Sequence, residues 1–389
     1  MSFPTNPTNG QIATLSNGIT YSYTSSTNYW ARLAGGVSAP PSFKNRLING
    51  AMTFAQRGSS PVSNAVASST IKYNTLDRWG YWAGSVGYFY LEQSTVAPPG
   101  YTNSALITSG SATTVSSGVY ATFSQRIEGY NVADLAWGTS SAQSVTVSFW
   151  VNCSVTGTFS GYVFNSGHSY CYPFTFTISS ANTWVQITKT ISGPTTGSWN
   201  NTTGIGLEFG ITLAAGSSWT ATANAWTSTS YAISSPGSTN LLATNGATMY
   251  VTGVQLEAGA SATTFDYRDY TRELQLCQRY YEMSYDVTTP PGTATDVGMT
   301  IQRGTTQGGG ALGSTVNFKV TKRGTPSLSF WNSSGGSGVW SGTYSGGGLT
   351  LTPSPTGVGQ NGFYQNTASG ISAWTNAEIY GQWTALSEL

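Results

Sequence analysis

Fourteen acidic side chains are the residues of this chain that could catalyse hydrolysis. A glycosidase needs two facing carboxyl groups, about 5–5.5 Å apart when it retains configuration and about 6.5–9.5 Å apart when it inverts it. The acids to consider are Asp77, Glu92, Glu128, Glu208 and Glu257, of which the four glutamates fall within or at the ends of expected strands. The sequence does not show which two of them meet in the folded chain, and no Gly-x-Ser-x-Gly nucleophile motif stands out. We therefore expect no catalytic residues.

Aromatic rings beside amide groups could instead bind a sugar, since such pockets combine apolar platforms with a few polar groups. Trp199 stands next to Asn200 and Asn201 in the polar run "GSWNNTTG", and Trp219 and Trp226 lie in the similar run "SSWTATANAWTSTS". Four more candidates border Gly-rich stretches nearer the C-terminus: Trp331, Trp340, Tyr344 and Phe363. The alternative for every ring is a place in the core, which is what we expect for Trp79. These nine residues are the predicted glycan contacts.

Few residues of this chain could bind a metal ion or form a disulfide. The cysteines are Cys153, Cys171 and Cys277, an odd number at spacings that match no metal motif. We expect small buried thiols, with a Cys153–Cys171 disulfide as the alternative. His168 is the only histidine, and no Asp-rich loop is visible, so we expect no metal ion and no cofactor.

The composition indicates an all-β protein. Only 7% of the 389 residues are charged, against about 25% in ordinary globular domains. Gly is abundant, with 47 residues, and aromatic residues reach 13%, which together favour many strands and turns. A net charge of +1 argues against a nucleic-acid partner. No run of 18 apolar residues occurs, and the start "MSFPTNPTNG" does not resemble a signal peptide, so we expect no membrane insertion.

The first 35 residues predict a small β-hairpin module. Asn9-Gly10 and Asn17-Gly18 are turn signals, and Ile19, Tyr21 and Tyr23 alternate with polar residues as in a strand. A unit of this size is not stable alone, so we expect it to dock on a partner. Residues 36–44 are rich in Pro and small residues and predict a linker.

Residues 45–268 predict a two-sheet sandwich, most simply a jelly roll. In the run 144–153, Val145, Val147, Phe149 and Val151 share one face. Seven strands are expected at regular spacing, over 87–93, 120–127, 144–153, 172–178, 183–191, 204–213 and 247–257.

Residues 269–285 predict the single helix of the chain, with Asp269 as its N-cap. Tyr270, Leu274, Cys277 and Tyr281 step by four, three and four, which is the period of a coiled-coil seam and predicts a trimer axis. The alternative is a single helix lying on a sheet. Residues 286–389 predict a second β-domain, with strands over 316–320 and near the C-terminus.

Four segments resemble the receptor-binding tail fibre proteins of tailed bacteriophages. The start of the chain resembles the module at the virion-attached end, and "NRLINGAMTFAQRGSS…NTLDRWGYW" resembles the opening of a jelly-roll domain. The run "VTGVQLEAGASATTFDYRDYTRELQLCQRYYE" resembles its closing strand and helix, and "VNFKVTKRGTPSLSF…AEIYGQWTALSEL" resembles a distal β-domain. The loops between these segments match nothing in the family.

The resemblance implies a homotrimeric fibre of the virion, made in the host cytoplasm. Residues 1–35 would attach to a tail or baseplate protein. The jelly roll, similar to carbohydrate-binding modules, or the distal domain would contact a host surface polysaccharide. Two other functions stay open: a polysaccharide-degrading tail enzyme, and an architectural tail protein with no ligand.

Overall fold

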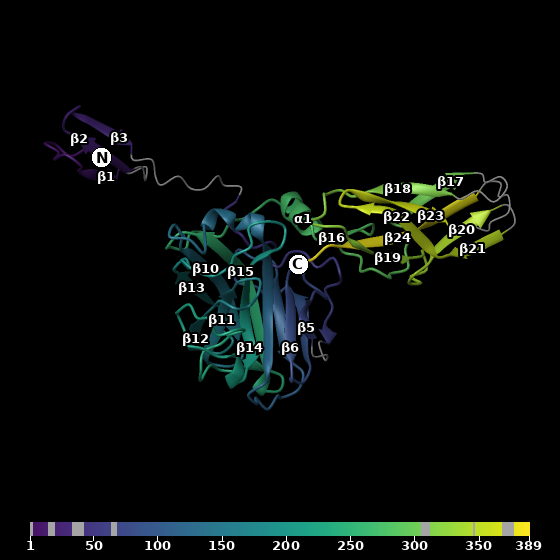
Figure 1. Ribbon diagram of the computed structural model, residues 1–389, viewed down its shortest axis with the longest axis horizontal. Coiled ribbons are helices and arrows are strands. Elements are labelled where there is room, and N and C mark those ends of the chain that lie inside the picture. Colours follow the sequence, from purple (N-terminus) through teal and green to yellow (C-terminus); the bar gives the residue numbers. More distant parts are fainter. Residues whose placement is uncertain are drawn as a thin grey trace. The chain divides into compact units, whose positions relative to one another are not determined.

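The computed structural model describes residues 3–14, 20–32, 43–63, 68–304, 312–344, 347–367 and 377–389 (Figure 1). The chain divides into two compact units, Met1–Lys44 and Asn45–Leu389. In the described ranges the structure is nearly all β with a single α-helix, which confirms the predicted fold class. Most of the predicted linker, residues 36–42, lies outside the described residues.

The first unit is a three-stranded antiparallel sheet, β1 (Ile12–Thr14), β2 (Thr20–Thr24) and β3 (Tyr29–Arg32). Phe3 stacks on Trp30 with ring centroids 4.8 Å apart and meets the edge of Tyr21 at 5.0 Å. Gly10 has φ +81°, as expected for the Asn9-Gly10 turn. The Asn17-Gly18 turn lies outside the described residues.

Two six-stranded antiparallel sheets form the sandwich, with several short 3₁₀ turns between strands. The order in one sheet is β13 (Val185–Ile191), β10 (Val145–Cys153), β15 (Thr248–Ala258), β8 (Ser104–Ser109), β7 (Phe89–Ser94) and β4 (Val62–Ser63). The order in the other is β12 (Cys171–Ile178), β11 (Gly157–Phe164), β14 (Ile205–Ala215), β9 (Tyr120–Glu128), β6 (Gly80–Gly84) and β5 (Ser68–Lys72). All seven predicted strands are present.

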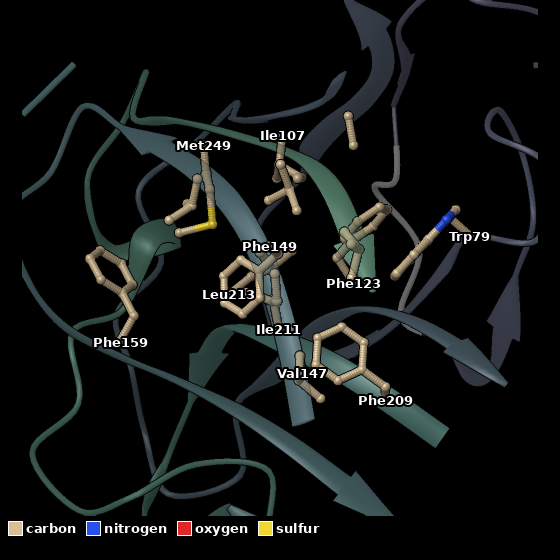
Figure 2. Close-up of a cluster of buried hydrophobic side chains, with 14 of the residues drawn as sticks. Trp79, Ile107, Phe123, Val147, Phe149, Phe159, Phe209, Ile211, Leu213 and Met249 are labelled. Atoms are coloured by element: carbon tan, nitrogen blue, oxygen red, sulfur yellow. The ribbon is translucent and has the colours of Figure 1, made fainter. Parts of the chain in front are cut away.

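The main core fills the space between these two sheets. Val147 and Phe149 of β10 face Phe209 and Ile211 of β14, and all four are fully buried (Figure 2). This is the inward face that the alternation in 144–153 predicts. Trp79 stacks on Phe123 at 4.9 Å, which confirms its place in the core.

Helix α1 (Tyr270–Gln278) is shorter than the predicted 269–285. Asp269 caps it by accepting a hydrogen bond from the Arg272 amide at 3.0 Å, as expected. The prediction that the helix continues past residue 278 is wrong, because Tyr281–Met283 forms strand β16 and pairs with the last strand of the chain. The side chains of Tyr281, Met283 and Tyr285 all enter one buried cluster, so this segment follows the period of a strand.

The part of the second unit that follows α1, which we call the C-terminal domain, is built around β24 (Ala377–Leu386). This strand pairs with β16 and β19 (Ser327–Trp331) and with β17 (Thr300–Gly304) and β20 (Trp340–Tyr344). Strand β21 (Gly347–Leu351) extends β20. A separate sheet has the order β18 (Gly313–Asn317), β23 (Gly362–Thr367) and β22 (Pro353–Gly359). The strand predicted over 316–320 therefore ends at Asn317.

Buried ion pairs connect this domain to the sandwich. The carboxylate of Glu388 binds Arg78 and lies 3.0 Å from Arg57 Nη2, and Arg126 Nη1 donates to the Leu389 carbonyl at 3.1 Å. Arg279, just after α1, binds Glu128 of β9 at 2.7 Å. The last residues of the chain thus lie against the outer face of the sheet that contains β9.

The three cysteines are free and buried, so the expectation of small buried thiols is confirmed. Cys153 lies in the core between the sheets and Cys171 in a cluster on the outer face of one sheet, which separates them. Burial raises the pKa of Cys171 to about 11. Within the described residues, no helix is long and apolar enough to cross a membrane, and no group of three His, Cys, Asp or Glu side chains could hold a metal ion.

Candidate functional site

A surface pocket of about 220 Å³ lies at one end of the sandwich, and we call it the tryptophan pocket. One wall is the 3₁₀ turn that follows β9, and the other is the loop that leads into β14. The lining residues are Val132, Ala133, Ala136, Trp137, Thr139, Trp199, Asn200 and Asn201. Three adjacent residues predicted from the sequence, 199–201, therefore line one pocket.

Hydrogen bonds to backbone carbonyls hold the indole rings of Trp137 and Trp199, and also that of Trp226, which packs beside them outside the lining. Trp137 meets the edge of Trp199 at 4.7 Å and lies 5.5 Å from Trp226. Each indole N–H donates to a backbone carbonyl, at 2.7 Å for Trp137, 3.1 Å for Trp199 and 2.7 Å for Trp226. Tyr170 stacks on the far side of Trp226 at 5.4 Å. A ligand would therefore meet rings that are already ordered, which lowers the entropic cost of binding.

Asn200 and Asn201 differ in the hydrogen bonds that their side chains form. Asn200 Oδ1 accepts from the Thr202 amide at 2.8 Å, which fixes the turn of the loop. Asn201 is exposed, and its side chain forms no hydrogen bond with any described residue. Its amide can therefore donate to and accept from a hydroxylated ligand. The nearby Asp134 is engaged by Arg46 in a pair of hydrogen bonds of 2.8 and 2.5 Å, and the lining itself carries no charged side chain.

Trp219 lies in a different aromatic cluster, on the outer face of the sheet that contains β14. It packs against Tyr120 with ring centroids 4.2 Å apart and against Tyr231 at 5.7 Å. Its indole N–H donates to the Gly118 carbonyl at 3.1 Å. The structure thus separates Trp219 from Trp199 and Trp226, with which the sequence grouped it.

A buried carboxylate lies beneath this second cluster. Glu208 accepts hydrogen bonds of 2.9 Å from Trp82 Nε1, Tyr162 O–H and Arg126 Nε. Burial alone would raise the pKa of Glu208, but His168, whose Nε2 lies 3.6 Å away, and Arg126 lower it to about 2. This carboxylate is therefore ionised at any physiological pH and acts as a structural acceptor.

Two of the C-terminal candidates belong to a core, and their prediction as ligand contacts is wrong. Trp340 is 1% exposed and donates to the Gln382 carbonyl at 3.0 Å, and Phe363 is buried in the same cluster. Trp331 is half-buried against Tyr285 and Met283, and Tyr344 packs partly on the cluster of Ile379. Neither Trp331 nor Tyr344 lines the tryptophan pocket.

No known family model matches this chain, and no curated protein matches it. Similar solved structures include the enzymatically active domain of tailspike protein 4 of bacteriophage CBA120, at 10% identity and TM-score 0.28, over 56% of this chain and 22% of that one. A family 4 carbohydrate-binding module matches at 16% identity and TM-score 0.29, over 54% of this chain and 98% of that one. A family 61 module in complex with β-1,4-galactotriose matches at 8% identity and TM-score 0.28, over 56% and 99%.

Sequence analysis missed Trp137, which lines the tryptophan pocket and is also part of the main core. It stands in "DLAWGTSS", where Ala136 adopts φ +52° and Trp137 follows directly. The signal in the sequence is a tryptophan placed directly before a glycine.

The predicted trimer seam is not one exposed helical stripe. Cys277 is buried against the sandwich, Tyr281 lies in β16, and Leu274 is half-buried. Only Tyr270 is largely exposed. Helix α1 ends at Gln278, before the fourth member of the predicted seam.

Proposed function

We propose that this chain is a non-catalytic, glycan-binding protein of a bacteriophage tail fibre. The observation that carries the proposal is the tryptophan pocket, where Trp199, Asn200 and Asn201 meet Trp137 in a space of about 220 Å³ without a charged lining residue. A sugar ring offers an apolar face to an indole and hydroxyl groups to an amide, which is the combination found here. A neutral sugar unit of a host surface polysaccharide is the ligand we propose.

The size of the pocket favours one sugar unit per site. Pockets for drug-sized ligands start at about 300 Å³, so a space of this size holds one unit or a chain end. Affinity per site would be weak, and a homotrimer would raise it about 10²–10⁴-fold through avidity. In this proposal the virion presents the trimer, and residues 1–35 attach it to a tail or baseplate protein.

Binding is favoured over hydrolysis because the buried acids of the sandwich are already occupied. Glu128 accepts from both Arg279 and the Tyr280 hydroxyl, at 2.7 and 2.8 Å. Glu257 accepts from Gln255 and from the hydroxyl and amide of Thr263. Glu208 likewise accepts from Trp82, Tyr162 and Arg126, so all three carboxylates are engaged by hydrogen bonds within the protein.

The test is a titration of the full chain, labelled with 5-fluorotryptophan, with glucose, galactose and N-acetylglucosamine. We expect at least one sugar to shift the fluorine resonance of Trp199, and Trp199→Ala to weaken its binding about tenfold. Trp150→Ala is the matched control, since this half-buried ring lies on β10 and outside the pocket. No response of Trp199 to any sugar or to purified host polysaccharide would favour the architectural alternative.

Two further measurements test the finer parts of the proposal. Light scattering should give three times the chain mass of 40.9 kDa. Incubation with host polysaccharide should release no reducing ends, whereas release that is lost on changing one acid would establish a hydrolase.

A further inference from the structure

A second pocket of about 180 Å³ lies beside the start of α1, and we call it the tyrosine pocket. It lies between the segments 45–54 and 265–273, and it shares no residue with the tryptophan pocket. Nothing in the proposed function uses it. The side chains that matter below are Thr53, Asp266, Tyr267, Arg268, Tyr270 and Glu273.

Two tyrosines with solvent-exposed rings line this pocket. Tyr267 is 62% exposed and Tyr270 is 58% exposed. Both rings are nevertheless fixed: Tyr267 packs on Phe265 at 4.9 Å and donates its hydroxyl to the Gly100 carbonyl at 3.1 Å, and Tyr270 packs on Phe54 at 4.8 Å. Large, ordered and uncovered aromatic faces are ready to stack on a ligand at little entropic cost.

Asp266, Arg268 and Glu273 form a cluster of charged side chains that lines the pocket. Arg268 lies 3.1 Å from Glu273 and 3.5 Å from Asp266, and it donates to the carbonyls of Asn45 and Leu47. Asp266 Oδ2 accepts the Asn45 amide at 3.2 Å, whereas Oδ1 accepts no hydrogen bond from the described residues. The Thr53 hydroxyl is likewise unused among them, so the pocket offers an acceptor and a hydroxyl to a ligand.

The net charge of this cluster determines which ligands the pocket favours. Two carboxylates face one guanidinium, which leaves an excess of one negative charge. The N-terminus of α1, which starts at Tyr270, offsets about half a charge of this excess. An anionic ligand is therefore disfavoured, and a cation is not required.

We infer that the tyrosine pocket is a second binding site for a neutral saccharide unit. The sugar would stack on Tyr270 or Tyr267 and place hydroxyl groups on Asp266 and Thr53. The volume of about 180 Å³ again limits the site to one unit. The inference does not depend on the tryptophan pocket, because the two sites share no side chain.

The experiment uses the full chain with Trp199→Ala, so that the tryptophan pocket does not contribute. Saturation-transfer NMR is recorded with glucose, galactose and N-acetylglucosamine, and with glucuronate as the anionic counterpart. We expect at least one neutral sugar to bind, and glucuronate to bind less tightly than glucose. Adding Tyr270→Ala should weaken binding about tenfold, and adding Asp266→Asn should weaken it several-fold. Tyr88→Ala, which removes a ring that is 39% exposed elsewhere on the sandwich, should change nothing.

Four results would overturn the inference. The first is that no neutral sugar binds the Trp199→Ala chain. The second is binding that Tyr270→Ala leaves unchanged while circular dichroism shows a folded protein. The third is glucuronate binding as tightly as glucose. The fourth is a fall in solution mass on Tyr270→Ala, which would mean that a second copy of the chain covers the pocket. A Trp199 fluorine resonance that responds to no sugar would refute the proposed function and leave this site standing.

Discussion

Arg323, in the C-terminal domain, donates from Nη1 to the carbonyl of Thr203 at 3.0 Å. Thr203 belongs to the loop that carries Asn200 and Asn201 and forms one wall of the tryptophan pocket. The same guanidinium donates to the carbonyls of Ser387 and Glu388, at 3.0 and 2.7 Å. One side chain therefore links the pocket wall to the end of the chain.

Replacing Arg323 should loosen this loop. We expect Arg323→Ala to speed hydrogen exchange at the amides of 200–204 and to weaken sugar binding several-fold, because Thr203 loses its partner from the other domain. Exchange followed by mass spectrometry measures the first effect, and titration measures the second. Arg303→Ala removes an exposed arginine of the same domain, which pairs with Glu378 at 3.1 Å, and should change neither. Unchanged exchange in Arg323→Ala would show that the loop needs no support from the C-terminal domain.

Replacing Trp340 should lower stability and leave sugar affinity unchanged, whereas replacing Trp199 should do the reverse. Trp340 is fully buried, so Trp340→Ala should lower the free energy of unfolding by about 3–5 kcal/mol. At temperatures where the variant is folded, its sugar affinity should equal that of the wild type. Trp199→Ala should lose affinity and little stability. Urea unfolding and sugar titration on both variants check this, and a loss of affinity in folded Trp340→Ala would return Trp340 to the list of ligand contacts.

The strands were predictable because apolar residues recur at every second position of the chain, although the polar residues between them, such as Thr146 and Ser148, are buried as well. Val145, Val147 and Phe149 face the core at every second position, and this period is visible in the sequence. The end of α1 was not predictable in the same way, since Tyr281 fits a helical stripe that begins at Tyr270 and also a strand that continues to Met283. Pairing of β16 with β24, about a hundred residues later, decides between the two periods.

The candidate sites were harder to predict than the fold. Trp199 and Trp340 both stand beside Gly and Ser, and nothing local separates the half-buried ring from the core one. The tyrosine pocket joins the segments 45–54 and 265–273, which are far apart in the sequence. Trp137 is followed by Gly138, whose amide donates to the Pro194 carbonyl of a distant loop at 2.8 Å, a contact that the local sequence does not reveal.

The buried Glu208 should make stability depend on pH in the acid range. Its pKa falls from 4.5 in the unfolded chain to about 2 in the folded one, so its contribution is present above pH 4.5 and is lost as the pH falls toward 2. This shift corresponds to about 3 kcal/mol. We expect Glu208→Gln to be less stable than the wild type at pH 7 by about this amount, with a smaller difference at pH 3. Urea unfolding of both proteins at the two pH values measures it, and a difference that is the same at both would contradict the assignment.

The side chain of Glu388 should join the sandwich to the C-terminal domain. Glu388 lies between the buried side chains of Arg57 and Arg78, so Glu388→Ala leaves two guanidinium groups without their shared carboxylate. Removing one partner of a buried pair costs about 3–5 kcal/mol. We expect calorimetry to show an earlier, separate transition for the C-terminal domain in this variant. The control is Glu378→Ala, which breaks the exposed pair with Arg303 and should cost less than about 1 kcal/mol. Equal effects of the two substitutions would mean that the buried pairs at Glu388 do not join the domains.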